Sequence, residues 1–483
     1  MRRLNVQWSR WIIFLLFPAT LSAQGLLLDD EAYNKLPRQP VYGDGSKSEN
    51  DLLKDKPKID LRPYCPTPQH QGAISSCTGW AAGYGAMTIL ESIRQKWNGH
   101  ADTITSSAYS ALFVYNQVKA GSCDAGADIA KAAALLRNKG NLRSKEFDRI
   151  KNNCDKQPNE AELRKATANR IKDYVTLFST DDPARIKIEK TKLSLAQKKP
   201  VIIGMLLRNN FQQIRRGDQF WRPDTGDTTF LGAHAMVVVG YDDGKEAFEV
   251  LNSWGPVWGN GGFIWVKYND FARFCCYGFQ FIPYDDPDQN RPYNARMQLR
   301  APIYDADDNW SFEDEELLFN GKYYELKRGA VPRNYMSQLF FPYITEDAYL
   351  YAFSYDASRK IKIHWPRDGN LDAQFSGKNE SAIIAFPEIN LAVPAENGAL
   401  IFESKGADHI CILVARQPLE RLNKQLQDLQ KLPPGDFLKN LYSAFGNDLV
   451  PQREVEYMTD MAGFSAYMRK GKAVPVVVRV RVE

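Results

Sequence analysis

The chain has 483 residues, of which 44% are hydrophobic and 25% are charged, and its formal net charge is +4. This is the composition of an ordinary globular protein that can bury full hydrophobic cores, and the length favours two or three domains. Removing residues 1–23, which contain three arginines and no acidic residue, lowers the charge from +4 to +1. So small a net charge does not indicate binding to nucleic acid or to a membrane surface, and neither partner is expected.

The N-terminus has the pattern of a secretory signal peptide. A basic start at Arg2 and Arg3 is followed by an apolar run at 11–17 and by small residues before Gln24. The run is shorter than the roughly 20 apolar residues that cross a bilayer. We therefore predict cleavage after residue 23, a secreted or periplasmic location, and no integral membrane segment after signal removal.

Residues 24–58 are predicted to form a short leader, and the chain that follows falls into two patterns. Up to about residue 180 it is expected to be mainly helical, with a helix that begins at Cys77 and others at 106–119 and 127–139. Residues 186–198 are interpreted as a helix or a charged loop. Strands are predicted beyond this segment, at 200–207, 236–241, 248–251 and 262–266.

These two parts contain the residues of a possible thiol active site. Gln71 lies six residues before Cys77, which opens the apolar helix. His234 begins an apolar strand, and Asn252 opens a segment rich in glycine and tryptophan. Alone, each residue has a plain structural explanation: a buried cysteine, a core histidine or an asparagine in a turn. Together and in this order they favour a catalytic interpretation.

The three motifs resemble the papain family of cysteine peptidases, over roughly residues 59–284. The resemblance implies an α+β fold, with a helical lobe, a β-barrel-like lobe and the active site between them. It implies that Cys77 is the nucleophile, its thiol pKa lowered by the helix N-terminus and by His234. His234 would protonate the leaving amine, and Asn252 would orient the imidazole.

The resemblance implies further site residues. Gln71 would donate a hydrogen bond to the oxyanion of the tetrahedral intermediate, beside the backbone N–H of Cys77. Trp254 would cover the contact between histidine and asparagine, and Trp254, Trp258 and Gly126 are expected to bind substrate. No cofactor or metal is expected, and the acidic run at 305–309 is interpreted as a solvated turn.

The sequence departs from the family pattern at three positions. Ile74 replaces a cysteine, Thr78 replaces the tryptophan that usually follows the nucleophile, and Ala233 replaces an acidic residue. Since Ile74 stands where the usual partner of Cys123 would be, Cys123 needs another partner, and Cys154 is our choice. The six cysteines other than Cys77 allow 15 connectivities, so the alternatives stay open. The leader is also much shorter than the helical propeptide common in the family, and we expect activity without further processing.

Residues 285–292 are predicted to be a linker, because prolines and aspartates concentrate there. Short alternating segments beyond it predict a β-sandwich accessory domain at 293–483, with a helical segment at about 418–470 and a last strand at 476–482. It loosely resembles a bacterial β-domain appended to exported enzymes, and its partner is unknown. We expect this domain to be separable from the catalytic part.

The function expected from the sequence is that of an exported cysteine endopeptidase acting on peptide or protein substrates. Two alternatives remain open: a peptide-binding or surface-assembly protein with a non-catalytic cleft, and a thiol acyl transferase. Labelling by a thiol-directed epoxide, lost in Cys77→Ala, would discriminate the binding protein from the enzymes.

Overall fold

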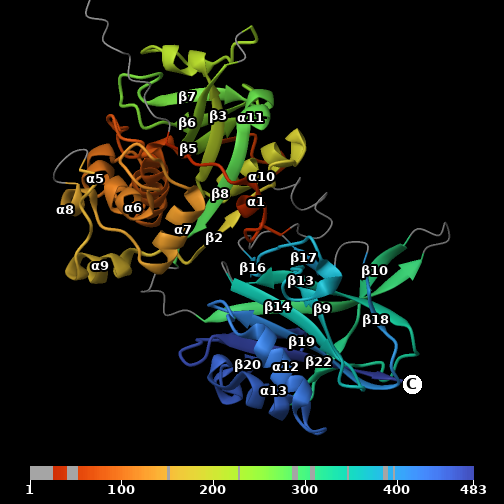
Figure 1. Ribbon diagram of the computed structural model, residues 1–483. Helices are drawn as coiled ribbons and strands as arrows, with labels where there is room; N and C mark the ends of the chain where they lie inside the picture. The colour runs from red at the N-terminus through yellow and green to blue at the C-terminus, as the bar shows by residue number, and fades with distance from the viewer. Residues whose placement is uncertain are drawn as a thin grey trace, which may run out of the picture.

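The structure is a computed structural model of the chain (Figure 1). It describes residues 25–40, 53–148, 153–226, 229–284, 292–304, 310–344, 348–384, 390–394 and 398–483. The predicted signal peptide, most of the predicted linker and the acidic run at 305–309 lie outside these residues.

The first part of the chain is helical, as predicted. A central helix begins at Cys77 and continues through three consecutive segments, α3 (Cys77–Gly79), η2 (Trp80–Met87, a π-helix) and α4 (Thr88–Arg94). Gly79 and Gly83 are needed where it meets α6, since a Cβ atom there would lie 2.3 and 2.4 Å from the carbonyl oxygens of Ala111 and Ser110. The surrounding helices are η1 (Arg62–Tyr64), α5 (Ala101–Ser106), α6 (Ala111–Val118), α7 (Ile129–Asn138), α8 (Ser144–Phe147), α9 (Glu160–Ala166) and η3 (Thr167–Asn169).

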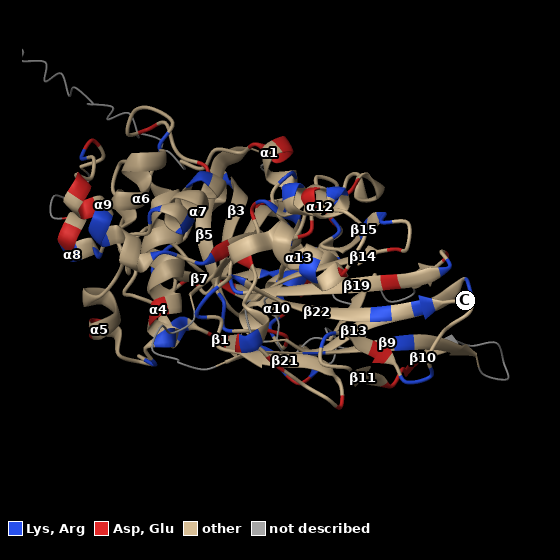
Figure 2. Cartoon of the chain, turned by 90° about the horizontal axis from the view of Figure 1, so that it is seen from below, with Lys and Arg blue, Asp and Glu red and all other residues tan. Residues whose placement is uncertain are grey.

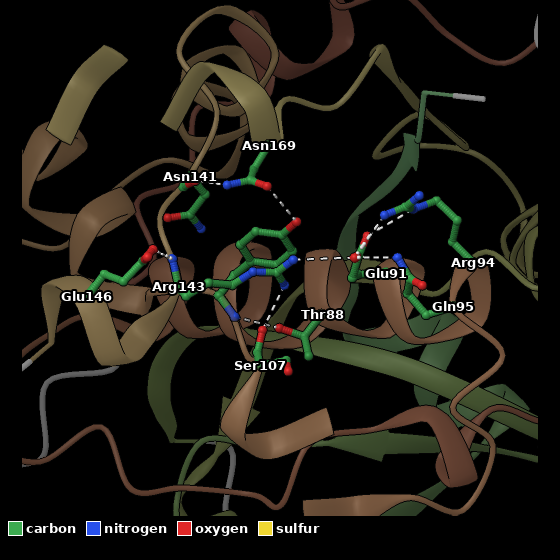
Figure 3. Close-up of polar contacts among 10 residues, drawn as sticks. Thr88, Glu91, Arg94, Gln95, Ser107, Asn141, Arg143, Glu146 and Asn169 are labelled. Atoms are coloured by element: carbon green, nitrogen blue, oxygen red, sulfur yellow. Dashed lines mark hydrogen bonds and ion pairs between the residues drawn. The ribbon is translucent and has the colours of Figure 1, made fainter. Parts of the chain in front are cut away.

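Polar contacts hold the far end of the central helix (Figure 3). The guanidinium of Arg143 donates to the Ser107 carbonyl at 2.7 Å and to Glu91 Oε1 at 3.3 Å, and it lies 4.0 Å from the ring centre of Tyr109. Tyr109 N–H in turn donates to Thr88 Oγ1 at 3.0 Å. These contacts fix the helix whose first residue is Cys77.

The second part of the chain forms an eight-stranded sheet with the order β2-β8-β3-β5-β6-β7-β4, in which β1 pairs with β5. The apolar run at 201–207 becomes β3 because both of its faces are covered. The strands are β1 (Lys58–Asp60), β2 (Asp173–Thr176), β3 (Val201–Arg208), β4 (Phe220–Trp221), β5 (Phe230–Asp242), β6 (Ala247–Leu251), β7 (Phe263–Lys267) and β8 (Cys275–Ile282). The associated helices are α10 (Ala184–Ala196), η4 (Asn209–Gln213) and α11 (Tyr268–Phe274).

The chain beyond residue 292 forms two further sheets, ordered β17-β13-β9-β21-β20 and β11-β12-β22-β19-β14-β15, with β10, β18 and β16 paired at their sides. One hydrophobic cluster contains buried residues of both sheets and of α12 and α13. The strands are β9 (Tyr293–Tyr304), β10 (Trp310–Asp314), β11 (Leu317–Phe319), β12 (Tyr324–Leu326), β13 (Tyr335–Ile344), β14 (Ala348–Tyr355), β15 (Ile361–Trp365), β16 (Ile383–Ile384), β17 (Leu391–Val393), β18 (Leu400–Phe402), β19 (Gly406–Ala415), β20 (Glu456–Tyr457), β21 (Ala462–Ala466) and β22 (Ala473–Val482).

The helical prediction for 418–470 is correct only in its first half. The α-helices are α12 (Leu422–Lys431) and α13 (Phe437–Phe445), followed by the short 3-10 helices η6 (Gly446–Asp448) and η7 (Gln452–Glu454); a further one, η5 (Ala373–Phe375), lies earlier in the chain. Gly446, with φ +55°, stops α13. Residues 462–466 then pair with β9, so tertiary pairing overrides their local helical pattern.

The part that carries the candidate residues, 53–284, which we call the catalytic part after its predicted role, shares a core with the β-rich part beyond residue 292. Val175, Leu193 and Ile282 belong to the hydrophobic cluster of the β-rich part. Across the same boundary, the buried hydroxyl of Tyr349 donates to Asp173 Oδ2 at 2.8 Å. This shared core argues against the expectation that residues 293–483 are separable, since truncation near residue 290 would expose these apolar side chains to water.

The segment 25–40, which we call the strap, precedes the catalytic part and contacts it at Ala127 and Thr176 and the β-rich part at Glu380. It contains α1 (Asp30–Asn34), which lies beside β8 and close to the β-rich part (Figure 1). Charged residues of both signs are interspersed over the face shown in Figure 2, as the near-neutral net charge suggests. Within the described ranges, no helix combines the length and the apolar character that crossing a bilayer requires.

Candidate active site

Cys77 is the first residue of α3, is not in a disulfide, and has no exposed surface. Burial raises the pKa of the Cys77 thiol to about 12, although hydrogen bonds with the backbone of Ala235 and with Thr78 act to lower it. The lowering of this pKa that the sequence predicts is therefore outweighed in this buried setting. Desolvation of a thiolate outweighs the partial charge of a helix end when water is excluded.

The side chains of His234 and Asn252 are in direct contact. His234 lies in β5, opposite Met205 of β3, and Asn252 follows the end of β6. His234 Nε2 lies 2.8 Å from Asn252 Oδ1, and both side chains are buried. Oδ1 also accepts the backbone N–H of Ser253 at 2.8 Å, so it is an acceptor. The imidazole must therefore carry its proton on Nε2, and Nδ1 is the nitrogen with the lone pair when the ring is neutral.

The start of the central helix and β5 lie against each other. The backbone of Ala235, the residue after His234, hydrogen-bonds to the Cys77 thiol. Thr78 Oγ1 donates to the carbonyl of Ala127 at 3.0 Å, which ties the same helix start to the segment before α7. The fold therefore brings Cys77 next to the residue that follows His234, and the His234 imidazole contacts Asn252.

Gln71 is buried beside this group. Its backbone N–H donates to the Ser253 carbonyl at 2.9 Å, and its Oε1 accepts from Ser253 Oγ at 2.6 Å. Its Nε2 donates to the Ile74 carbonyl at 3.1 Å. Since an amide nitrogen carries two hydrogens, one of them remains for a second acceptor.

An aromatic cluster covers the histidine. The ring of Trp254 lies 5.3 Å from that of His234, and it contacts Phe211 and Trp258 at 5.3 and 5.6 Å. Trp254 is partly exposed, whereas only 7% of Trp258 is exposed. This burial favours a role for Trp258 in supporting Trp254 rather than in touching substrate.

The strap lies between the two parts that carry the candidate residues. Leu26 N–H donates to the carbonyl of Ala233, the residue before His234, at 3.3 Å. On the opposite side, Leu27 N–H donates to the Ala127 carbonyl at 3.1 Å, and Ala127 N–H donates to the Gly25 carbonyl at 2.8 Å.

Gly126, predicted to bind substrate, has φ +75° and lies against the strap, since a Cβ atom there would sit 2.5 Å from the Gly25 carbonyl oxygen. Residues 24–58 are predicted from the sequence to be a short leader, and the contacts of residues 25–27 with Ala127 and Ala233 are not predicted. The apolar run of Leu26, Leu27 and Leu28 in that polar segment is the sequence signal for such a contact.

The predicted bond between Cys123 and Cys154 is confirmed, and it closes a loop with a sequence separation of 31 residues. In the part of the chain that the structure describes, the one group with the spacing of metal ligands consists of these two cysteines and Asp155. Because both thiols are used in the disulfide, this group does not offer a metal site.

Comparisons with known proteins identify the family that this part of the chain resembles. Residues 58–277 match the model of the family described as papain family cysteine protease. An uncharacterised peptidase C1-like protein of Acanthamoeba polyphaga mimivirus is 26% identical over 231 residues, which cover 45% of this chain and 72% of the viral protein. The oryzain beta chain of Oryza sativa subsp. japonica is 25% identical over 203 residues, 42% of this chain and 39% of that protein.

Among solved structures, xylellain, a cysteine protease from Xylella fastidiosa, has 23% sequence identity and a TM-score of 0.44, covering 55% of this chain and 97% of that chain. These two relatives match less than half of this chain, and the rice protein is matched over well under two thirds of its own length. Residues 58–277 of this chain form a cysteine peptidase domain of the papain family.

Proposed function

We propose that the chain is an exported cysteine endopeptidase that hydrolyses peptide bonds through Cys77, His234 and Asn252. The observation that carries the proposal is the 2.8 Å contact between His234 Nε2 and Asn252 Oδ1, next to the helix that starts at Cys77. The Nε2 proton is held by the asparagine, so Nδ1 is left to exchange a proton with the thiol.

The reaction begins when His234 Nδ1 takes the thiol proton. The Cys77 sulfur attacks the substrate carbonyl carbon, and the carbonyl oxygen becomes an oxyanion. The second hydrogen of Gln71 Nε2 and the backbone N–H of Cys77 stabilise this oxyanion. The C–N bond then breaks as the imidazolium protonates the leaving amine, and a thioester between sulfur and substrate remains.

Water completes the cycle. His234 removes a proton from a water molecule, whose oxygen attacks the thioester carbon. The C–S bond breaks, the acid product leaves and Cys77 regains a proton. Trp254 shields the histidine–asparagine contact from competing water during these steps, and its 5.3 Å distance to the imidazole supports this role.

Main-chain groups beside the thiol are suited to binding an extended peptide. The carbonyl of Ala233 and both backbone groups of Ala127 bind the strap in this way, and Gly126 leaves space for a backbone to approach. We assign Gly126 and Trp254 to substrate binding. Secretion or a periplasmic location is part of the proposal, and the disulfide supports it because such bonds persist in oxidising compartments.

The test is hydrolysis of a fluorogenic peptide library by the purified chain, as isolated and after mild proteolysis that releases the strap. Cys77→Ala should abolish turnover, whereas the matched control Cys276→Ala, which removes another non-disulfide thiol, should retain it. Turnover by a folded Cys77→Ala protein would refute the mechanism. Retention of peptides without cleavage, under every condition, would favour the binding-protein alternative.

A further inference from the structure

The strap makes three successive attachments, and each is to a different part of the molecule. Its first residues lie between Ala127 and Ala233, at the candidate active site. Its helix α1 is anchored on β8. Its last residues lie between β2 and the segment 379–381 of the β-rich part. A single stretch of 16 residues therefore connects the active site to the C-terminal region.

The first attachment uses the groups expected to bind a peptide substrate. The bridge between Leu26 and Ala127 is parallel, and Leu26 also donates to the carbonyl before His234. Only 7% of Leu26 is exposed, and its Cδ2 atom lies 2.7 Å from where a Cβ atom on Gly204 would be. The chain passes so close to Ser75, two residues before the nucleophile, that a Cβ atom on Gly25 would lie 2.2 Å from the Ser75 carbonyl oxygen.

The second attachment centres on Tyr33, which is 3% exposed. Its ring stacks on Tyr277 at 4.1 Å, and its hydroxyl donates to the Phe178 carbonyl at 2.8 Å and accepts the N–H of Gly278 at 3.0 Å. Tyr277 in turn donates to Asp30 at 2.8 Å. These contacts hold the middle of the strap on the catalytic part.

The third attachment comes from the β-rich part. Arg38 N–H donates to the Asn379 carbonyl at 2.9 Å, and Ser381 N–H donates to the Arg38 carbonyl at 2.8 Å. The Asn379 side chain adds hydrogen bonds from Nδ2 to the carbonyls of Asn34, at 2.8 Å, and Leu36. On its other edge, the strap pairs with Thr176 of β2.

We propose that the C-terminal β-rich region is a latch: its segment 379–381 holds the strap across the substrate-binding groups, so that access to Cys77 depends on this contact. The proposal rests on the proposed function, in which the backbone groups that contact the strap near Leu26 bind the peptide substrate. While the strap is in place, a peptide cannot use the Ala233 and Ala127 backbone groups. A partner or a proteolytic cut that loosens the latch therefore opens the enzyme.

The burial of the nucleophile agrees with a closed state. Cys77 has no exposed surface and its thiol pKa is raised by desolvation. A closed active site explains why a residue that must meet substrate is fully covered. The latch also gives the β-rich region a role that its own histidines and cysteine, which lie in strands β15 and β19, do not supply.

The experiment measures how fast iodoacetamide alkylates Cys77, with the modified residue located by mass spectrometry in chains that retain residues 25–40. Asn379→Ala removes the latch side chain, and Leu26→Asp places a charge where the strap is buried. Losing the two side-chain hydrogen bonds of Asn379 should raise the alkylation rate by roughly 5- to 150-fold, if each has the usual net strength. Leu26→Asp should raise it as well.

Each variant has a matched control. Lys378→Ala changes the exposed neighbour of Asn379, and Leu28→Asp introduces the same charge two residues further on, where the side chain is 37% exposed. Both controls should be alkylated at the wild-type rate. A synthetic peptide of residues 25–40 should return the Leu26→Asp protein to slow alkylation, whereas the same peptide carrying the Leu26→Asp change should not.

The outcomes separate this proposal from the proposed function. Fast alkylation in Asn379→Ala and Leu26→Asp without peptide hydrolysis would support the latch and refute the peptidase. Wild-type protein that is alkylated as fast as both variants would overturn the latch, whatever its activity. Equally slow alkylation of the wild type and of both variants would also overturn it, provided that thermal unfolding shows all three proteins to be folded.

Discussion

Replacing Asn252 by alanine tests the role of the histidine–asparagine contact. Oδ1 of Asn252 is 2.8 Å from His234 Nε2, and both residues are buried, so water does not readily replace the lost acceptor. During catalysis the imidazole becomes a cation, and hydrogen bonds to charged groups contribute about 1.5–3 kcal/mol. At 1.36 kcal/mol for each factor of ten, the variant should lose roughly 10- to 150-fold in kcat.

The assay is steady-state hydrolysis of a short fluorogenic peptide by strap-released enzyme. KM should change little if Asn252 orients the base without touching substrate, as proposed. Asn260→Ala, a change of the same size in the same loop, is the control and should retain wild-type kcat, because the hydrogen bonds that Asn260 makes to described residues come from its backbone. A folded Asn252→Ala enzyme as fast as the wild type would refute the reasoning, and so would a loss confined to KM.

Three further predictions concern the oxyanion, the disulfide and the shared core. Gln71→Ala should lower kcat by about 10²–10³-fold if its amide stabilises the oxyanion, and an effect on KM alone would instead assign it to substrate binding. Replacing Cys123 and Cys154 together by serine should lower the free energy of unfolding by about 4 kcal/mol, from the entropy of a loop spanning 31 residues, and an unchanged urea midpoint would contradict this. Tyr349→Phe should lower the free energy of unfolding by about 1.5–3 kcal/mol, because Asp173 loses a buried donor, whereas Tyr343→Phe at an exposed position should not.

The candidate site could be predicted from sequence because its residues lie in distinctive local settings. Cys77 opens a glycine-rich apolar helix, and His234 begins the buried run of β5, which continues to Tyr241 although the strand itself starts at Phe230. The strands of the catalytic part were located by runs such as 201–207, since a strand covered on both faces is continuously apolar. Local pattern and tertiary environment agree at these positions.

Other features depend on contacts between distant segments. The raised pKa of Cys77 follows from how closely the lobes and the strap surround it, which composition does not indicate. The sequence of the strap indicates its position only through three consecutive leucines. Where they lie is decided by backbone hydrogen bonds of Leu26 and Leu27 to Ala233 and Ala127. Residues 462–466 form a strand because β9 offers them a partner. In each case a long-range contact decides between local alternatives.

The central claim is that Cys77 is the nucleophile of a peptidase, and covalent trapping tests it most directly. Strap-released protein is treated with a thiol-directed epoxide, the adduct is mapped by mass spectrometry, and remaining peptidase activity is measured on the same samples. We predict that activity falls in proportion to modification of Cys77 and that Cys77→Ala protein forms no adduct that affects activity. Full modification of Cys77 with activity retained, or loss of activity that follows modification of Cys276 instead, would contradict the account.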